Sequence, residues 1–310
     1  MLDVGDGNRV YRETCGNPRG KPAVVLHGGP GSGCSPGFRR SFDPAAYRVV
    51  LLDQRGCGRS TPSASAYETD VSVNTTAHLI ADLERLRRRL RIERWLVWGV
   101  SWGSVLGLRY AQTRPGAVSD LMLTGVAATG SNAEVALLTR GLGGIFPEAF
   151  GRFVGALPDG DRDGRLAAAC NRLLGSTDAG ARERAVRDRT DLETAIVPAP
   201  RSVPRYEDPV FRSGFARTVT HYWCNGHFLG EGDERVVLRD AHLLKGIPGT
   251  LVQGGLDFGN LLETAWRLHH AWPGSELLLV EEAGHDAGAP GTKDLPIATT
   301  DRYAARQGVS

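Results

Sequence analysis

Short apolar runs, separated by glycine-rich turns and amphipathic stretches, organise the first 125 residues of the chain. Such runs are typical of strands buried on both faces of a sheet, and they predict strands at residues 23–26, 47–53, 95–100 and 118–125. Leucine and isoleucine recur every three or four positions in residues 74–90, and residues 105–111 form a second helix-like stretch. This alternation predicts a parallel sheet covered by helices on both faces.

The pattern changes after about residue 127. Residues 130–240 carry many charges and few strand-like runs, and segments such as 165–174 and 181–196 are helix-like. A proline-rich break follows at 197–204. We expect a mainly helical insertion that lies over the sheet.

The sheet pattern then returns, and an alternating run near the N-terminus adds one more strand to the prediction. The further predicted strands are residues 10–14, 249–257 and 276–280, and the further helices are 261–271 and 297–306. We therefore expect an α/β core of residues 1–128 and 241–310, with residues 129–240 as a helical cap.

Composition and charge exclude several classes of protein. The chain has 37 basic and 35 acidic residues among 310, a formal net charge of +2, which gives no electrostatic reason to expect nucleic acid or an anionic membrane as a partner. No apolar run is long enough for a membrane span, and no secretory signal is visible at the N-terminus. Five cysteines without a Cys-x-x-Cys pair argue against a disulfide framework or a zinc site. We expect a cytoplasmic protein with reduced thiols.

The strongest chemical signal is Gly-Val-Ser-Trp-Gly at residues 99–103, between a predicted strand and a predicted helix. Strand, sharp turn and helix form the context in which Gly-x-Ser-x-Gly is a nucleophile elbow. The glycines avoid Cβ clashes at the turn, and Ser101 projects above the sheet. The N–H of Trp102 lies at a helix N-terminus and can donate to a developing oxyanion.

Two further loops follow predicted strands. His-Gly-Gly-Pro-Gly-Ser-Gly at residues 27–33 lacks the endings of a phosphate-binding loop, so with an elbow downstream we interpret it as an oxyanion loop that His27 braces. Asp53 and Arg55 lie in the second loop, where we expect a structural ion pair rather than a catalytic role.

A serine nucleophile needs a base and a carboxylate that orients the base. Ser101, Asp257 and His285 have the Ser–Asp–His order of α/β-hydrolases, and the last two each follow a predicted strand. An aspartate after Gly-Gly-Leu is alternatively a turn residue. The other histidines, such as His221 and His227 in the insertion, lack such a context. The prediction is a catalytic triad.

The chain resembles the proline iminopeptidase (prolyl aminopeptidase) family of α/β-hydrolases. The resemblance rests on His-Gly-Gly-Pro-Gly at 27–31, Asp-Gln-Arg-Gly-Cys-Gly-Arg-Ser at 53–60, the elbow, Gly-Leu-Asp at 255–257 and Ala-Gly-His at 283–285. It implies the α/β-hydrolase fold with a helical cap, and a serine aminopeptidase that removes N-terminal proline without metal or cofactor. It also implies oxyanion N–H groups on Gly29 and Trp102.

The chain departs from this family where the substrate is chosen. The family has a glutamate for the substrate's amino group in a segment that here reads Ala-Arg-Thr-Val-Thr-His-Tyr-Trp at 216–223, with Val219 at the glutamate's position. A family segment Trp-x-x-Trp-Glu keeps only its glutamate, Glu193. The resemblance implies a substrate site around Glu193, Val219 and Tyr222. Three acids are candidates to compensate for the lost glutamate: Glu207, Asp208 and Glu231.

The substrate therefore stays open between two versions of one chemistry. The first is a prolyl aminopeptidase acting on short peptides, and the second is an esterase or acyl-transfer enzyme acting on a small metabolite, which Val219 favours. A hypothesis from another class is a non-catalytic small-molecule binder, and the complete triad order argues against it. The sequence does not indicate the oligomeric state.

Overall fold

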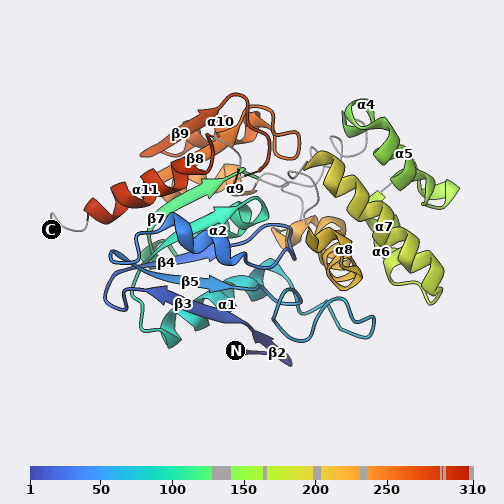
Figure 1. Cartoon of the computed structure of the whole chain (residues 1–310), viewed down its shortest axis with the longest axis horizontal. Coiled ribbons are helices and arrows are strands. Elements are labelled where there is room, and N and C mark those ends of the chain that lie inside the picture. The colour runs from blue at the N-terminus through green and yellow to red at the C-terminus, as the bar shows by residue number, and fades with distance from the viewer. Residues whose placement is uncertain are drawn as a thin grey trace.

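The computed structural model describes residues 1–127, 141–162, 166–197, 204–230, 236–286, 288 and 291–306. Its centre is a seven-stranded sheet with the strand order β3-β5-β4-β6-β7-β8-β9 (Figure 1). The strands are β3 (Arg12–Gly16), β4 (Lys21–Leu26), β5 (Tyr47–Leu52), β6 (Trp95–Val100), β7 (Val118–Thr124), β8 (Gly249–Gly254) and β9 (Ser275–Val280). Strand β3 pairs antiparallel with β5, and the later strands pair in parallel. The mostly parallel sheet is as predicted.

Helices cover both faces because successive residues of a buried strand point to opposite sides. Val24 and Val97 pack in one cluster with helices α1 (Thr76–Arg89), α2 (Trp102–Thr113) and α10 (Leu262–Ala271). Val25 and Trp98 pack in another with Tyr303 of α11 (Asp294–Ala305). Both helical layers are as predicted, and the predicted helix at 74–90 is α1, which the Thr75 side chain caps.

The predicted strand at residues 10–14 is two strands of different sheets. Strand β2 (Asn8–Val10) pairs with β1 (Leu2–Gly5) in a separate hairpin, and β3 begins at Arg12. Tyr11 separates them because its N–H donates to the Ser60 hydroxyl and its carbonyl accepts from the Asp53 N–H. Sequence alternation does not reveal this change of sheet, since the hydrogen-bond partners lie far along the chain.

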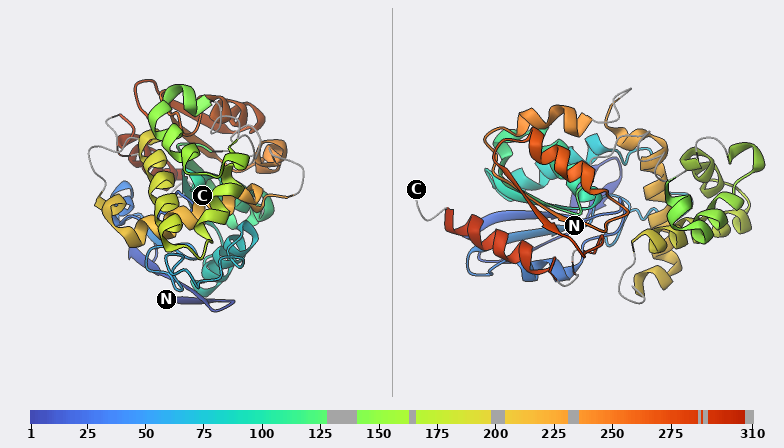
Figure 2. Two further views of the ribbon diagram at one scale, coloured as in Figure 1. Left: turned by 90° about the vertical axis from the view of Figure 1, so that its right-hand side faces the viewer. Right: turned by 90° about the horizontal axis from the view of Figure 1, so that it is seen from above.

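Five of the described α-helices between β7 and β8 lie beyond the carboxyl ends of the parallel strands, as two views show (Figures 1 and 2). They are α4 (Leu142–Ile145), α5 (Pro147–Gly155), α6 (Leu166–Leu174), α7 (Ala179–Ile196) and α8 (Pro209–Cys224). Phe153, Leu166 and Leu192 belong to a hydrophobic cluster of their own. The predicted first boundary of the cap, after residue 128, and the proline-rich residues 198–203 lie outside the described residues. Short helix α9 (Val236–Arg239) packs with the sheet cluster, although the predicted boundary assigns it to the cap.

No helix in the described part of the chain combines the length and apolar character that crossing a bilayer requires. In the same ranges, His, Cys, Asp and Glu side chains do not gather in groups of three or more that could hold a metal ion.

Candidate active site

Strand β6 leads directly into Ser101, and α2 begins at the next residue. Ser101 has φ 54° and ψ −124°, a conformation that side chains rarely adopt. The flanking glycines allow it, because a Cβ on Gly99 would lie 2.3 Å from the Gly103 carbonyl oxygen and one on Gly103 would lie 2.0 Å from the Leu26 carbonyl oxygen. The predicted turn therefore has the tight packing that an elbow requires, and it aims the serine away from the sheet.

The structure brings Ser101, His285 and Asp257 together from the ends of three strands. The Ser101 hydroxyl donates to Nε2 of His285 at 2.9 Å, and Nδ1 of His285 donates to Oδ2 of Asp257 at 2.8 Å. Asp257 follows β8 and His285 follows β9, so both reach the edge of the sheet where β6 ends. This chain of hydrogen bonds provides a route by which the serine proton can pass to the imidazole.

The buried Asp257 carboxylate raises the pKa of His285. Burial by itself would lower the pKa of His285, but the hydrogen bond and charge of Asp257 outweigh burial and raise that pKa above 6.5. Asp257 is also a turn residue, since its Oδ1 accepts the N–H groups of Gly259 (3.0 Å) and Asn260 (2.8 Å). Asp257 therefore lies in a turn, and the turn orients its carboxylate toward the imidazole.

The glycine-rich loop after β4 lies against the serine. A Cβ on Gly28 would lie 3.0 Å from the Ser101 Cβ, and Gly29 has φ 111°, which favours glycine. His27 braces the loop, because its Nε2 accepts the Gln54 N–H at 3.0 Å and its Nδ1–H donates to the Gly28 carbonyl at 2.9 Å. Gly29 and Trp102 both line the cavity beside Ser101. Trp102 begins α2, where first-turn N–H groups have no acceptor inside the helix.

A cavity of about 80 Å³ lies beside Ser101, and loops at the strand ends and helices α7 and α8 line it. At about 10–15 Å³ for each water-sized group it has room for roughly five to eight such groups. Its polar or aromatic lining residues, apart from Ser101 and His285, are Trp102, Glu193, Trp223, His227, Phe258 and Asn260.

Of the three side chains expected to bind substrate, the structure brings Glu193 to this cavity and not Val219 or Tyr222. Val219 is fully buried inside α8 packing and does not line the cavity. Tyr222 is also fully buried, where its ring packs 4.9 Å from that of Trp102 and its hydroxyl donates to Asn74. Tyr222 thus supports the wall of the site without facing it.

Glu193 is tied to a buried arginine. Both Nη groups of Arg189 donate to Oε2 of Glu193 at 3.1 Å, and the guanidinium stacks 4.1 Å over the Trp223 ring. Arg189 is fully buried, so the pair holds the carboxylate in one position. Of the three proposed compensating acids, Glu207 lines a different cavity, Asp208 caps α8 and Glu231 lies outside the described residues.

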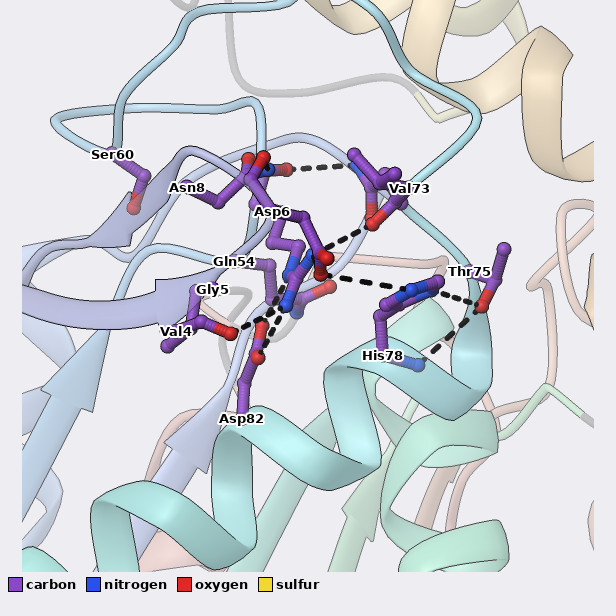
Figure 3. Close-up of polar contacts among 12 residues, drawn as sticks. Val4, Gly5, Asp6, Asn8, Gln54, Ser60, Val73, Thr75, His78 and Asp82 are labelled. Atoms are coloured by element: carbon purple, nitrogen blue, oxygen red, sulfur yellow. Dashed lines mark hydrogen bonds and ion pairs between the residues drawn. The ribbon is translucent and has the colours of Figure 1, made fainter.

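Asp53 and Arg55 belong to structural networks, although they do not pair with each other. Arg55 donates two hydrogen bonds to Asp82 (2.7 and 2.9 Å) and reaches the carbonyls of Val4 and Val73 (Figure 3). Asp53 accepts from the Cys34 N–H and from Arg59, and these contacts lower its pKa although burial alone would raise it. These networks fix the loop that carries Gln54, and through Gln54 they fix His27.

Sequence reasoning missed Trp223, His227, Phe258 and Asn260, all of which line the cavity. Asn260 carried a usable signal, since an Asx turn at Asp257 places the residue three positions on beside the same carboxylate. His227 gave no comparable signal, because its position depends on how the segment after α8 (Pro209–Cys224) folds back onto Trp102.

Comparisons with known proteins agree with this fold. A family profile of the α/β-hydrolase fold matches residues 21–291. A probable proline iminopeptidase of Streptomyces coelicolor is 75% identical over 306 residues, covering 98% of this chain and 94% of the relative. A proline iminopeptidase of Xanthomonas citri is 41% identical over 306 residues, covering 98% and 95%. Two solved structures each have a TM-score of 0.63 and 20% identity, and support the fold: an Exiguobacterium antarcticum esterase, covering 97% of both chains, and a Mycobacterium smegmatis proline iminopeptidase, covering 98% and 97%.

Proposed function

Because this chain belongs to the proline iminopeptidase family of α/β-hydrolases, we propose that it releases N-terminal proline from short peptides through an acyl-enzyme on Ser101. The observation that carries the proposal is the continuous chain of hydrogen bonds from the Ser101 hydroxyl through His285 to Asp257. Such a chain activates a serine for acyl transfer.

In the proposed mechanism His285 takes the Ser101 proton as the serine oxygen attacks the scissile carbonyl. The oxyanion that forms accepts hydrogen bonds from the N–H groups of Gly29 and Trp102. His285 then gives the proton to the leaving amine, and the C–N bond breaks. A water molecule, activated by the same imidazole, hydrolyses the prolyl ester and restores Ser101.

Size and charge support a small amino-terminal acyl group. The cavity volume of about 80 Å³ suits a group about as large as a prolyl residue. Glu193 supplies a carboxylate for the substrate's ammonium group, because its Oε1 accepts no hydrogen bond from another described residue. We propose that helices of residues 129–240 act as a cap that closes this subsite.

One observation favours a second candidate function. Val219 is buried and apolar where the family's glutamate is expected. The remaining carboxylate, that of Glu193, already forms an ion pair with Arg189. A cavity with reduced negative charge suits an uncharged acyl group, so the alternative is an esterase or acyl-transfer enzyme acting on a small metabolite.

A pair of matched substrates separates the two functions. Proline p-nitroanilide and the p-nitrophenyl ester of cyclopentanecarboxylic acid present rings of similar shape, and the second lacks the amine. The proposed function predicts release of nitroaniline from the first, and competitive inhibition of ester turnover by proline amide. Ester turnover with neither effect supports the alternative. An organophosphonate probe that leaves Ser101 unlabelled at neutral pH contradicts both and favours a binding protein.

We propose that the protein is located in the cytoplasm. Cys34, Cys57 and Cys170 are buried thiols that form no disulfide, which suits this reducing compartment.

A further inference from the structure

His227 has a backbone conformation that few residues other than glycine adopt. It lies in a short 3₁₀ segment after α8 with φ 56° and ψ 16°, and Phe228 follows with φ 54°. The Thr76 hydroxyl donates to the His227 carbonyl at 2.6 Å and ties the segment to α1. An unfavourable conformation that is fixed in this way indicates that the surroundings determine where the side chain lies.

The imidazole lies over the candidate oxyanion residue. Its ring stacks on that of Trp102, with centroids 5.3 Å apart and an angle of 23° between the planes. The Trp102 ring is itself fixed, because its Nε1–H donates to Gln54 and its edge packs against Tyr222. His227 thereby forms part of the cavity wall next to Ser101.

The hydrogen-bonding capacity of this imidazole is unused by the described residues. His227 is 4% exposed, and its Nδ1 is buried without a hydrogen-bond partner among them. The other two fully or largely buried histidines of the loop and cap differ, because His27 bonds to Gln54 and His221 bonds to the Asn74 carbonyl. Nε2 also has no hydrogen-bond partner among the described residues, and unlike Nδ1 it is not closed off from the cavity. Native proteins seldom leave an imidazole unpaired at both nitrogens, so at a binding site the ligand is the expected partner of Nε2.

The charge state decides what this imidazole can do. Burial lowers the pKa of His227 to about 3, so the ring is neutral near pH 7 and carries one donor and one acceptor nitrogen. A neutral acceptor suits a cationic ligand, because it binds an N–H group without adding a positive charge beside it. Glu193 lines the same cavity and gives only part of its capacity to Arg189.

We infer that His227 is a specificity-determining residue whose imidazole accepts a hydrogen bond from the ammonium group of the substrate's N-terminal residue, next to Glu193. The inference rests on the proposed aminopeptidase function and deepens it. A prolyl ammonium has two N–H groups, and the two side chains supply one acceptor to each. This arrangement also accounts for amine recognition in a chain that has Val219 in place of the glutamate.

The test compares His227→Gly and His227→Asn with the wild-type protein. Glycine removes the ring and asparagine keeps an acceptor, and both tolerate the left-handed backbone, so folding is preserved. We expect His227→Gly to lower kcat/KM for proline p-nitroanilide about tenfold or more, mainly through KM, because a hydrogen bond to a charged group is lost. Turnover of the cyclopentanecarboxylate ester should change less than about threefold, and His227→Asn should recover part of the loss.

Each other outcome has a defined meaning. Equal losses on the two substrates overturn the inference and make His227 a support for Trp102 alone. Unchanged kinetics on both substrates in His227→Gly overturn it as well. A wild-type protein that neither cleaves proline p-nitroanilide nor binds proline amide overturns the proposed function itself, whereas a wild-type preference for proline that survives in His227→Gly overturns only this inference.

Discussion

The two sides of the cavity are built differently. The sheet side consists of loops at strand ends, where Ser101, His285 and Asp257 bond to one another and to the backbone. The helical side consists of α7, α8 and the segment after α8, where Arg189 and His227 each keep a buried nitrogen without a hydrogen-bond partner among the described residues. The catalytic side chains of the sheet side are thus already paired with one another, whereas we propose that the His227 imidazole of the helical side gains its partner from the substrate. We infer that the first side determines the chemistry and the second the selectivity.

The largest expected effect tests the sheet side. Ser101→Ala removes the nucleophile, and we expect kcat to fall at least about 10⁴-fold, as for other serine hydrolases that lose one triad member. Binding of proline amide should stay within about threefold of wild type, because the helical side is unchanged. Stopped assays measure kcat, and calorimetry measures the binding of proline amide. A parallel loss of turnover and binding contradicts the division between the two sides.

A substitution of Asp257, also on the sheet side, should alter the pH dependence of kcat/KM. His285 acts as a base only when neutral, and its pKa is raised above 6.5, so kcat/KM of the wild type should rise with pH and level off above that raised pKa. Asp257→Asn removes the charge that outweighs burial. The midpoint should therefore move to lower pH, and the plateau should fall about 10³- to 10⁴-fold. A pH–rate profile from pH 5 to about 9 measures both, and an unshifted midpoint contradicts the role given to Asp257.

The sequence predicts the sheet side of the cavity well and the helical side poorly. Gly-x-Ser-x-Gly, the buried strand before Asp257 and the partly exposed apolar strand before His285 are local patterns, and the parallel sheet then brings their ends together. The positions of Val219 and Tyr222 depend instead on the rotation of α8 about its axis. Every residue from Gly214 to Tyr222 except Arg217 is buried, so polar and apolar side chains of that stretch are both covered and their pattern does not indicate which side meets the cavity. His227 depends on a chain reversal that no local pattern indicates.

On the helical side, we expect a charged substitution of Val219 to destabilise the protein. Val219 is fully buried and does not line the cavity, so a glutamate at this position enters the packing around α8. We expect Val219→Glu to lower the free energy of unfolding by at least about 3 kcal/mol, since a charge is buried without a partner, and to leave proline release no faster. Val210→Glu is the control on the same helix, where Val210 is 62% exposed and the change should stay within about 0.5 kcal/mol. Faster proline release by Val219→Glu contradicts the placement of this residue.

The smallest expected effect concerns the carboxylate of the helical side. Glu193→Gln keeps the size and one acceptor oxygen but removes the charge that we propose faces the ammonium group of the substrate. We expect kcat/KM for proline p-nitroanilide to fall about 10- to 100-fold through KM, which corresponds to about 1.4–2.7 kcal/mol, while turnover of the cyclopentanecarboxylate ester changes little. Glu183→Gln, an exposed position on the same helix, should alter neither. Thermal unfolding of Glu193→Gln separates lost recognition from the loss of the Arg189 ion pair, which acts on stability whatever the substrate. Equal losses on both substrates would show that Glu193 shapes the cavity rather than selects the amine, and the helical side would then act through packing alone.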